Sequence, residues 1–196
     1  EGGVLTLADS LIAGNSGTRG GGMFIVSGTV SLNNTNVTDN QCESYGGGGI
    51  ANPGGTLYIT GGEIHHNKAN SASVNGGGVS NDNIAVIADS EIYANTSSGD
   101  GGGISNSGNL TLDNTKVMSN TANGSGGGGG LFNFGSGQST IIHTGIISNT
   151  ASFYGGGVAN NATLTRINVI LGENVTLYAN SDVGRGGGGL YNSGAS

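Results

Sequence analysis

A repeat of about 27 residues constrains the fold of this chain more than any other feature. Seven times, at intervals of 25 to 32 residues, a glycine triplet precedes an apolar residue. In six of these repeats an asparagine follows two residues later, and Ile25 takes that place in the first. The apolar residues are Met23, Ile50, Val79, Ile104, Leu131, Val158 and Leu190. The asparagines are Asn52, Asn81, Asn106, Asn133, Asn160 and Asn192. A period of this length is typical of a solenoid.

A second marker lies about half a repeat further on and supports the same period. It is an aliphatic residue three places before an asparagine, and it shifts in step with the first marker. The pairs are Ile12 with Asn15, Val37 with Asn40, Ile64 with Asn67, Ile92 with Asn95, Val117 with Asn120, Ile146 with Asn149, and Leu177 with Asn180. Two markers that move together indicate one continuous repeat domain, residues 1–196.

Each unit has the pattern of three short strands separated by polar and glycine-rich turns. One strand follows the glycines, one alternates as in Leu110-Thr111-Leu112, and one ends at the second asparagine. Because a unit of this size cannot bury a core alone, equivalent strands must pair coil on coil, roughly 4.8 Å apart. We therefore predict an all-β, right-handed parallel β-helix, a three-sheet solenoid of about seven coils of 25–32 residues.

Composition and charge exclude several classes of protein. The 43 glycines occur with a single proline, Pro53, and without the strict third-residue spacing of collagen. The net charge is −7 and the five Lys and Arg residues are scattered, so there is no basic stripe for nucleic acid. No apolar run is long enough for membrane insertion. Cys42 is the single cysteine and forms no internal disulfide, and we expect no cofactor.

The repeated asparagines and glycines have structural roles in this interpretation. An asparagine amide both donates and accepts, so stacked asparagines can form hydrogen-bonded ladders along the axis. Glycine permits positive φ and close backbone approach at a corner that recurs in every coil. The glycine runs lack the lysine and the following helix of a phosphate-binding loop. We therefore predict two asparagine ladders and no phosphate site.

The run from Gly101 to Ala122 resembles the repeats of chlamydial polymorphic outer-membrane proteins and of bacterial cell-surface and autotransporter β-helix adhesins. It has the form GGGI-x-N-x-G-x-L-T-L, followed by N-T-A. The chain departs from the chlamydial form, which favours GGA and Phe-x-x-N. The resemblance implies an extracellular or cell-surface protein used for structure or adhesion, with other copies, surface glycans or a neighbouring cell surface as partners.

A structural or adhesive surface fibre is the first hypothesis for function. The alternative is a carbohydrate-active enzyme, a polysaccharide lyase or glycosidase, because many of these share the fold. Glycosidic cleavage needs two carboxylates about 5 to 9 Å apart. Asp89 and Asp113, in the turns of successive coils, are the candidates, and His143 lies one coil further on. Because aspartates in turns commonly accept hydrogen bonds from turn amides, we expect no catalytic residue.

Ice binding is the second alternative, and it needs a flat threonine ladder. The middle position of the alternating strand does not form a threonine ladder. It is occupied by Thr6, Ser31, Tyr58, Val86, Thr111, Ile141 and Ile170. A metal site is also not expected, because His65 and His66 are adjacent and would point to opposite sides of a strand.

An apolar stripe is expected on the outside of the third strand. One position beyond its core residue, successive coils carry His65, Tyr93, Met118, Ile147 and Tyr178. Exposed apolar stripes often mark contact surfaces. We predict that the last four of these side chains are covered by another chain or another segment.

The two ends of the chain carry complementary parts of one coil. The chain begins with the second strand of a repeat, which contains Val4, Leu5 and Leu7. It ends with the first strand of a repeat, which contains Leu190 and Asn192. Joined end to end, two copies would complete a repeat of acceptable length, and neither end has a recognisable cap. We expect head-to-tail stacking of copies into a filament, or continuation as part of a longer solenoid.

Overall fold

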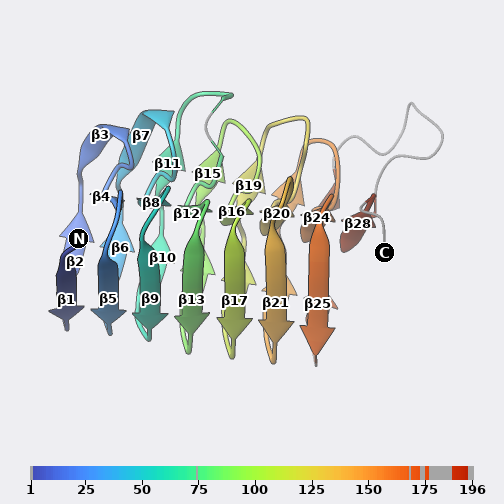
Figure 1. Ribbon diagram of the computed structural model, residues 1–196. Helices are drawn as coiled ribbons and strands as arrows, with labels where there is room; N and C mark the ends of the chain where they lie inside the picture. The colour runs from blue at the N-terminus through green and yellow to red at the C-terminus, as the bar shows by residue number, and fades with distance from the viewer. Residues whose placement is uncertain (1, 74, 168, 173–174, 177–186, 194–196) are drawn as a thin grey trace.

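The computed structural model describes residues 2–73, 75–167, 169–172, 175–176 and 187–193, which form an all-β parallel solenoid. Four sheets of seven strands run the length of the molecule, and each strand pairs with its equivalents in the neighbouring coils (Figure 1). The predicted class is confirmed. The prediction of three sheets was wrong, because the structure has four. The number of turns is about six, where seven coils were predicted. In the part described, no helix is present that could cross a membrane.

The bounds of the strands follow the repeat. Sheet A contains β1 (Val4–Ala8), β5 (Thr29–Asn33), β9 (Thr56–Thr60), β13 (Ile84–Ala88), β17 (Asn109–Asp113), β21 (Gln138–Ile142) and β25 (Thr163–Ile167). Sheet B contains β2 (Leu11–Ala13), β6 (Asn36–Thr38), β10 (Glu63–His65), β14 (Glu91–Tyr93), β18 (Lys116–Met118), β22 (Gly145–Ile147) and β26 (Ile170–Gly172).

The other two sheets contain shorter strands. Sheet C contains β3 (Ser16–Arg19), β7 (Gln41–Tyr45), β11 (Lys68–Ala69), β15 (Thr96–Ser97), β19 (Thr121–Ala122), β23 (Thr150–Ala151) and β27 (Val175–Thr176). Sheet D contains β4 (Met23–Phe24), β8 (Ile50–Asn52), β12 (Val79–Asn81), β16 (Ile104–Asn106), β20 (Leu131–Asn133), β24 (Val158–Asn160) and β28 (Leu190–Asn192). Sheet C is the one that the sequence did not reveal, because most of its strands are two small or polar residues with no alternation.

The core is built from the inward positions of sheets A, B and D. In β9, Leu57 and Ile59 are buried while Tyr58, between them, points outward. Sheet B contributes one core residue per coil, such as Ile92, and sheet D contributes the residue after the glycines, such as Ile104. Stacking these columns removes a continuous row of aliphatic side chains from water, which no single coil could do.

Residues with positive φ turn the chain at two corners of the first six coils. Between sheets A and B they are Asp9, Asn34, Gly61 with Gly62, Asp89, Asn114 and His143. Between sheets B and C they are Gly14, Asp39, His66, Ala94, Ser119 and Ser148. Asn, Asp and Gly tolerate this conformation best, which explains their frequency at the corner between sheets A and B; the corner between sheets B and C also accepts His66, Ala94, Ser119 and Ser148.

Both predicted asparagine ladders are confirmed. The first joins the side chains of Asn15, Asn40, Asn67, Asn95, Asn120 and Asn149, at the corner before sheet C. The second joins the side chains of Asn52, Asn81, Asn106, Asn133, Asn160 and Asn192, at the end of sheet D. In each ladder the Nδ2 of one asparagine donates to the Oδ1 of the next coil, at 2.6–3.0 Å.

The glycine columns allow the backbones of successive coils to approach closely. A Cβ atom on Gly77 would lie 2.3 Å from the carbonyl oxygen of Gly102, and one on Gly102 would lie 2.5 Å from that of Gly129. No side chain fits at such a distance, so glycine is required by coil stacking and not by an anion.

The last coil departs from the predicted repeat. Leu171, not Leu177, pairs with Ile146 in sheet B and takes the core position. The core position predicted for Leu177 was therefore wrong, because a nearer aliphatic residue reaches the same register, and Leu177 itself lies outside the described residues. Asn180 and Tyr178 lie outside the described residues.

Candidate functional site

The outer face of sheet D and the turns that border it carry most of the aromatic side chains of the described residues, and this face is hollowed over the first three coils. Strand register places one outward residue of each coil on its floor. The floor residues are Phe24, Ala51, Ser80, Ser105, Phe132, Ala159 and Tyr191. The aromatic members stand at the first, fifth and last places of this floor. Ser105, Phe132 and Ala159 are 2%, 7% and 0% exposed, so beyond the first three coils much of the floor is covered by the chain itself.

Two rims border this floor. The first rim is the residue after each asparagine of the second ladder. Except at Pro53, which has no N–H, its backbone amide donates to the carbonyl oxygen of the asparagine in the preceding coil. Its members include Pro53, Asp82, Ser107, Phe134, Asn161 and Ser193. The second rim is the end of sheet C with the segment that leads from it to sheet D. It carries Arg19 and Tyr45, the last residues of β3 and β7, and Asp100 and Tyr154 in the connecting segments of later coils. We call the floor and both rims the aromatic groove.

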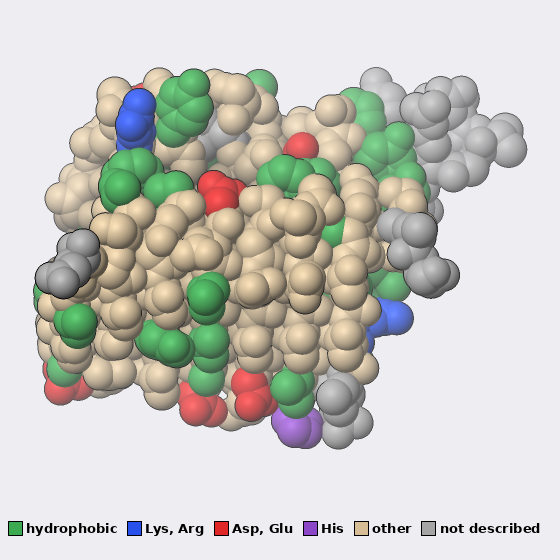
Figure 2. Space-filling view, in the orientation of Figure 1, with side chains coloured by type: hydrophobic (Ala, Val, Ile, Leu, Met, Phe, Trp, Pro, Cys, Tyr) green, Lys and Arg blue, Asp and Glu red, His purple; other side chains and the backbone are tan. Residues whose placement is uncertain are grey.

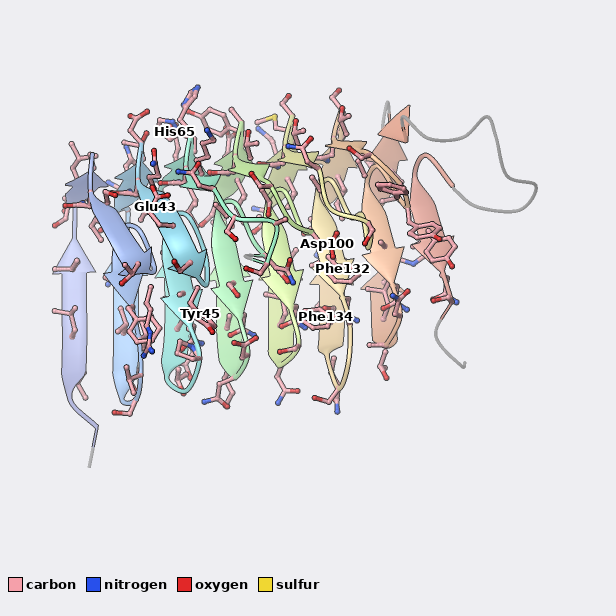
Figure 3. The ribbon with its side chains drawn as sticks, turned by 90° about the horizontal axis from the view of Figure 1, so that it is seen from above. Glu43, Tyr45, His65, Asp100, Phe132 and Phe134 are labelled. Carbon is pink, nitrogen blue, oxygen red and sulfur yellow. The ribbon has the colours of Figure 1, made fainter. Side chains whose placement is uncertain are left out.

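Aromatic side chains meet within the groove in three clusters. Phe132 on the floor stacks on Phe134 of the first rim, with ring centroids 4.9 Å apart. Tyr191 on the floor stacks on Tyr154 of the second rim at 4.5 Å. Figure 3 places Tyr45, Phe132 and Phe134 on one side of the row of coils and His65 on the other. Figure 2 shows separate groups of hydrophobic side chains along the upper part of this face, with acidic side chains between them.

The third cluster forms a cleft of about 320 Å³ over the first three coils. It is lined by Arg19, Phe24, Tyr45, Gly46, Ala51, Pro53, Ser80 and Asp82. Tyr45 is 66% exposed and Phe24 is 39% exposed, so both rings are available to a ligand. The guanidinium carbon of Arg19 lies 5.7 Å from the centroid of the Tyr45 ring, a cation–π contact. An apolar cleft with a few polar groups at its edge is the usual form of a small-ligand site.

Asp100 fixes the second rim near the middle of the groove. Its Oδ1 accepts hydrogen bonds from the backbone amides of Gly126 at 2.7 Å and Gly127 at 3.0 Å. A Cβ atom on Gly126 would lie 2.4 Å from the other carboxylate oxygen and 2.8 Å from the Phe132 ring, so this segment lies directly against the floor. Burial raises the pKa of the Asp100 carboxyl, and the two amides oppose that shift only in part.

Asp89 and Asp113, the candidate carboxylates of the enzyme alternative, occupy different positions of the coil. Asp113 ends β17, whereas Asp89 occupies the positive-φ corner opposite Asn114, so the two are not equivalent in register. Asp89 accepts from the Asn114 side chain at 2.6 Å, and Asp113 contacts the Nδ1 of His143 at 3.4 Å. The partners are side chains of the next coil instead of the expected turn amides, because stacking brings corner side chains together. Asp113 is absent from the lining of the shallow hollow beside Asp89, which holds Ser90, Glu91, Asn114 and Lys116.

The two adjacent histidines lie close together, contrary to expectation. His66 has positive φ and turns back, which brings its Nδ1 to 2.7 Å from the Nδ1 of His65. The Tyr93 ring stacks on His65 at 4.7 Å and its hydroxyl donates to Glu63 at 2.7 Å, which raises the pKa of Tyr93 to about 12. Burial, and then the neighbouring His66, lower the pKa of His65. No group of three ligands suited to a metal occurs among the residues that the structure describes.

The predicted lateral stripe is present in part. Tyr93, Met118 and Ile147 form one outward column of sheet B, and each is half-buried. Gly172 follows Ile147 in this column, so the placement of Tyr178 there was wrong. Coverage of the stripe by another chain stays a prediction.

The register of sheet A also corrects the expected middle column. Thr111 is followed by Thr140 and Thr165, not by Ile141 and Ile170, because Ile141 is buried in the core and Ile170 belongs to β26. Three threonines in succession are still preceded by Tyr58 and Val86, so the column is not a uniform threonine ladder.

The predicted stacking residues lie on the outermost strands. Val4, Leu5 and Leu7 belong to β1 at the edge of sheet A, and Leu190 and Asn192 belong to β28 at the edge of sheet D. Head-to-tail stacking stays a prediction.

Comparisons of this chain with protein-family models, curated proteins and solved structures give no match. The suspected relationship to bacterial surface β-helix repeats is therefore untested, and function is inferred from the residues of the groove. Sequence reasoning missed this groove. The signal was present at the residue between each post-glycine apolar residue and its asparagine, which is aromatic in Phe24, Phe132 and Tyr191.

Proposed function

We propose that the chain is a structural and adhesive solenoid, displayed outside the cell, that binds saccharides in the cleft over its first three coils and does not cleave them. The cleft between Phe24 and Tyr45 carries this proposal. A pyranose ring has apolar C–H faces and a rim of hydroxyl groups. An exposed aromatic face matches the first, and nearby charged and hydroxyl groups match the second.

The polar groups at the cleft suit hydroxyl recognition. Asp82 on the first rim offers an acceptor, and its Oδ1 is already oriented by the Ser107 hydroxyl at 2.7 Å. Arg19 on the opposite rim has a guanidinium group that can donate hydrogen bonds and that lies near the Tyr45 ring. A ligand held between them could form hydrogen bonds to both rims while its apolar face covers an aromatic ring.

The carbohydrate-active enzyme is the second candidate, and the lining of the cleft favours binding over it. Hydrolysis with acid and base needs two carboxylates about 5 to 9 Å apart. Asp82 is the one acidic residue among those lining the cleft. Asp89 and Asp113 lie at the corner between sheets A and B, away from sheet D. The repeated coils and two continuous amide ladders also suit a rod that presents a binding surface.

Equilibrium binding of the purified chain to a panel of oligosaccharides tests this function. We expect Tyr45→Ala to weaken binding by about tenfold, the order expected for loss of one stacking contact. Tyr58→Ala is the matched control, because Tyr58 is a similarly exposed aromatic residue, 44%, on sheet A. It should bind as the parent does. Binding that is equal in Tyr45→Ala and parent, or release of cleavage products that stops in Asp82→Asn, would contradict the proposal.

A further inference from the structure

Two histidines and the carboxylates around them form a cluster on the opposite side of the solenoid from the cleft. His65 ends β10 in sheet B, and His66 follows it at the corner between sheets B and C. Figure 3 shows His65 on the other side of the row of coils from Tyr45. His65 is half-buried and His66 is exposed. Neither residue lines the cleft, so the chemistry of this cluster is independent of saccharide binding.

The two Nδ1 atoms of the histidine pair converge. They lie 2.7 Å apart, and the planes of the two rings are nearly perpendicular, at 80°. Two nitrogens that bind one ion at about 2.0 Å and about 90° apart lie about 2.8 Å from each other, whereas tetrahedral ligands at the same distance lie about 3.3 Å apart. The spacing of the pair therefore matches two neighbouring corners of a square-planar site, the geometry that Cu²⁺ prefers with nitrogen and oxygen ligands.

We propose that His65 and His66 bind a Cu²⁺ ion through their Nδ1 atoms, with water in the remaining positions. Among the residues that the structure describes, no third histidine, cysteine or carboxylate joins the pair in a ligand group, so the site has two protein ligands and is open to solvent. The ion takes the place of the proton that lies between the two Nδ1 atoms. Because His66 is exposed, its ring can turn by the small amount that directs both lone pairs at one ion.

The neighbours of His65 hold its ring as outer partners hold a metal-binding histidine. Its Nε2 lies 3.6 Å from the carboxylate of Glu63, and the Tyr93 hydroxyl donates to that carboxylate at 2.7 Å. The Tyr93 ring stacks on the His65 ring, with centroids 4.7 Å apart. A carboxylate beside Nε2 favours the tautomer with its proton on Nε2, which leaves the lone pair of Nδ1 available to an ion.

The charge around the pair favours a cation. The carboxylates of Glu63 and Asp39 both act electrostatically on His65. Asp39 occupies the same corner one coil earlier, and its carboxylate accepts from the Thr38 hydroxyl, whose oxygen lies 3.2 Å from the Nδ1 of His65. Lys68, the closest cation in the sequence, belongs to sheet C beyond the corner. A positive ion is therefore attracted to the pair.

Other ions fit the pair less well. Mg²⁺ and Ca²⁺ take oxygen ligands, which two imidazoles do not supply. Zn²⁺ binds imidazole, but its tetrahedral geometry needs a wider spacing of the two nitrogens. Among divalent ions of the first transition row, Cu²⁺ also forms the most stable complexes with a given set of nitrogen ligands.

Titration of the purified chain with copper(II) chloride, followed by calorimetry and by electron paramagnetic resonance, tests the inference. The copper spectrum of the parent should show coupling to two nitrogen nuclei. His66→Asn keeps a residue that tolerates positive φ, and it should weaken copper binding by more than about tenfold and leave coupling to one nitrogen. His143→Asn is the matched control, because His143 also occupies a positive-φ corner and contacts a carboxylate, that of Asp113. It should bind copper as the parent does.

A second variant, Glu63→Gln, tests the positioning of His65. It keeps an acceptor for the Tyr93 hydroxyl and removes the charge beside Nε2, so copper affinity should fall by about tenfold while the spectrum keeps both nitrogens. If His66→Asn does not fold, Glu63→Gln and the spectrum of the parent decide the question. Equal copper affinity in the parent and either variant, or a parent spectrum without coupling to two nitrogens, would overturn the inference. Tighter binding of Zn²⁺ than of Cu²⁺ would also overturn it.

Discussion

The two asparagine ladders look alike in the sequence and differ in what they hold. In the first ladder, each Oδ1 accepts from both the side-chain and the backbone amide of the asparagine one coil earlier, as Asn95 does for Asn67. In the second ladder, Oδ1 accepts mainly from side chains, as Asn106 does for Asn81. The first ladder therefore satisfies a buried backbone group in every coil, whereas the second secures the turn beneath the first rim of the groove.

This difference shows that two asparagine columns repeated equally often need not contribute equally to the stability of the fold. A buried amide without a partner costs more than a weakened hydrogen bond between groups that keep other partners. In the first ladder the side-chain amides also donate to carbonyl oxygens, but the backbone amides depend on the Oδ1 of the next coil, as those of Asn67 and Asn95 do. The second shares its bonds with turn carbonyls and with Ser139, so its members are partly redundant.

The largest expected effect is the loss of an asparagine from the first ladder. Asn95→Ala would leave the buried backbone amide of Asn67 without its partner and would remove the bond from Asn95 to the Ile64 carbonyl. We expect the free energy of unfolding to fall by about 3 kcal/mol. Chemical denaturation measures this loss, and hydrogen exchange should show lost protection at the Asn67 amide.

The matched variant Asn106→Ala should cost less, about 1–2 kcal/mol, because no buried amide is orphaned. Asn81 keeps the carbonyl of Asn109, and Asn133 keeps the hydroxyl of Ser139. Equal losses in the two variants would show that the ladders are energetically equivalent.

A smaller effect concerns Asp100, which binds amides at the second rim with a carboxylate instead of a neutral amide. Burial raises its pKa in the folded state. Folding therefore disfavours the charged form of Asp100 and lowers the stability of the protein wherever that form is present. This loss of stability is absent below the pKa of Asp100 in the unfolded state and complete above its pKa in the folded state. Asp100→Asn, which keeps an acceptor oxygen, should be more stable than the parent at neutral pH.

The stability difference between Asp100→Asn and the parent should shrink as the pH falls into the acid range. Denaturant titrations at a series of pH values measure it. A difference that grows on acidification would mean that the carboxylate is stabilised by its amide partners.

The smallest expected effect is at Ser139, which replaces an aliphatic residue in the column that also contains Leu110 and Leu164. Its hydroxyl donates to Asn133 and accepts from Asn106. Ser139→Ala should cost about 0.5–1 kcal/mol, because both amides keep a second partner. Thermal unfolding checks this value, and a loss as large as that of Asn95→Ala would refute the redundancy of the second ladder.

The repeat predicted the solenoid, its parallel pairing and both ladders, because each marker recurs once per coil and stacking brings equal positions together. It failed in the last coil, where Leu171 and Leu177 both satisfied the local pattern and only pairing with Ile146 distinguished them. It missed sheet C because two-residue strands such as Thr121–Ala122 have no periodicity of their own.

The candidate site was harder to predict than the fold. Asp89 and Asp113 were chosen because carboxylates carry chemistry, yet register separates them by one position at a corner. Phe24, Phe132 and Tyr191 lie far apart in the chain. A single aromatic residue in one repeat forms no periodic pattern, so the sequence did not indicate that the three belong to one column.

The sequence by itself determined that coils stack, because spaced aliphatic residues, glycines and asparagines are satisfied only by their own equivalents one coil away. The tertiary structure decided which outward side chains become neighbours. That depends on the exact register of each strand and on the path of each turn, since a shift of one residue moves a side chain from the core to the surface. The groove is therefore a property of stacking, and the column that forms its floor becomes visible only when the coils are aligned.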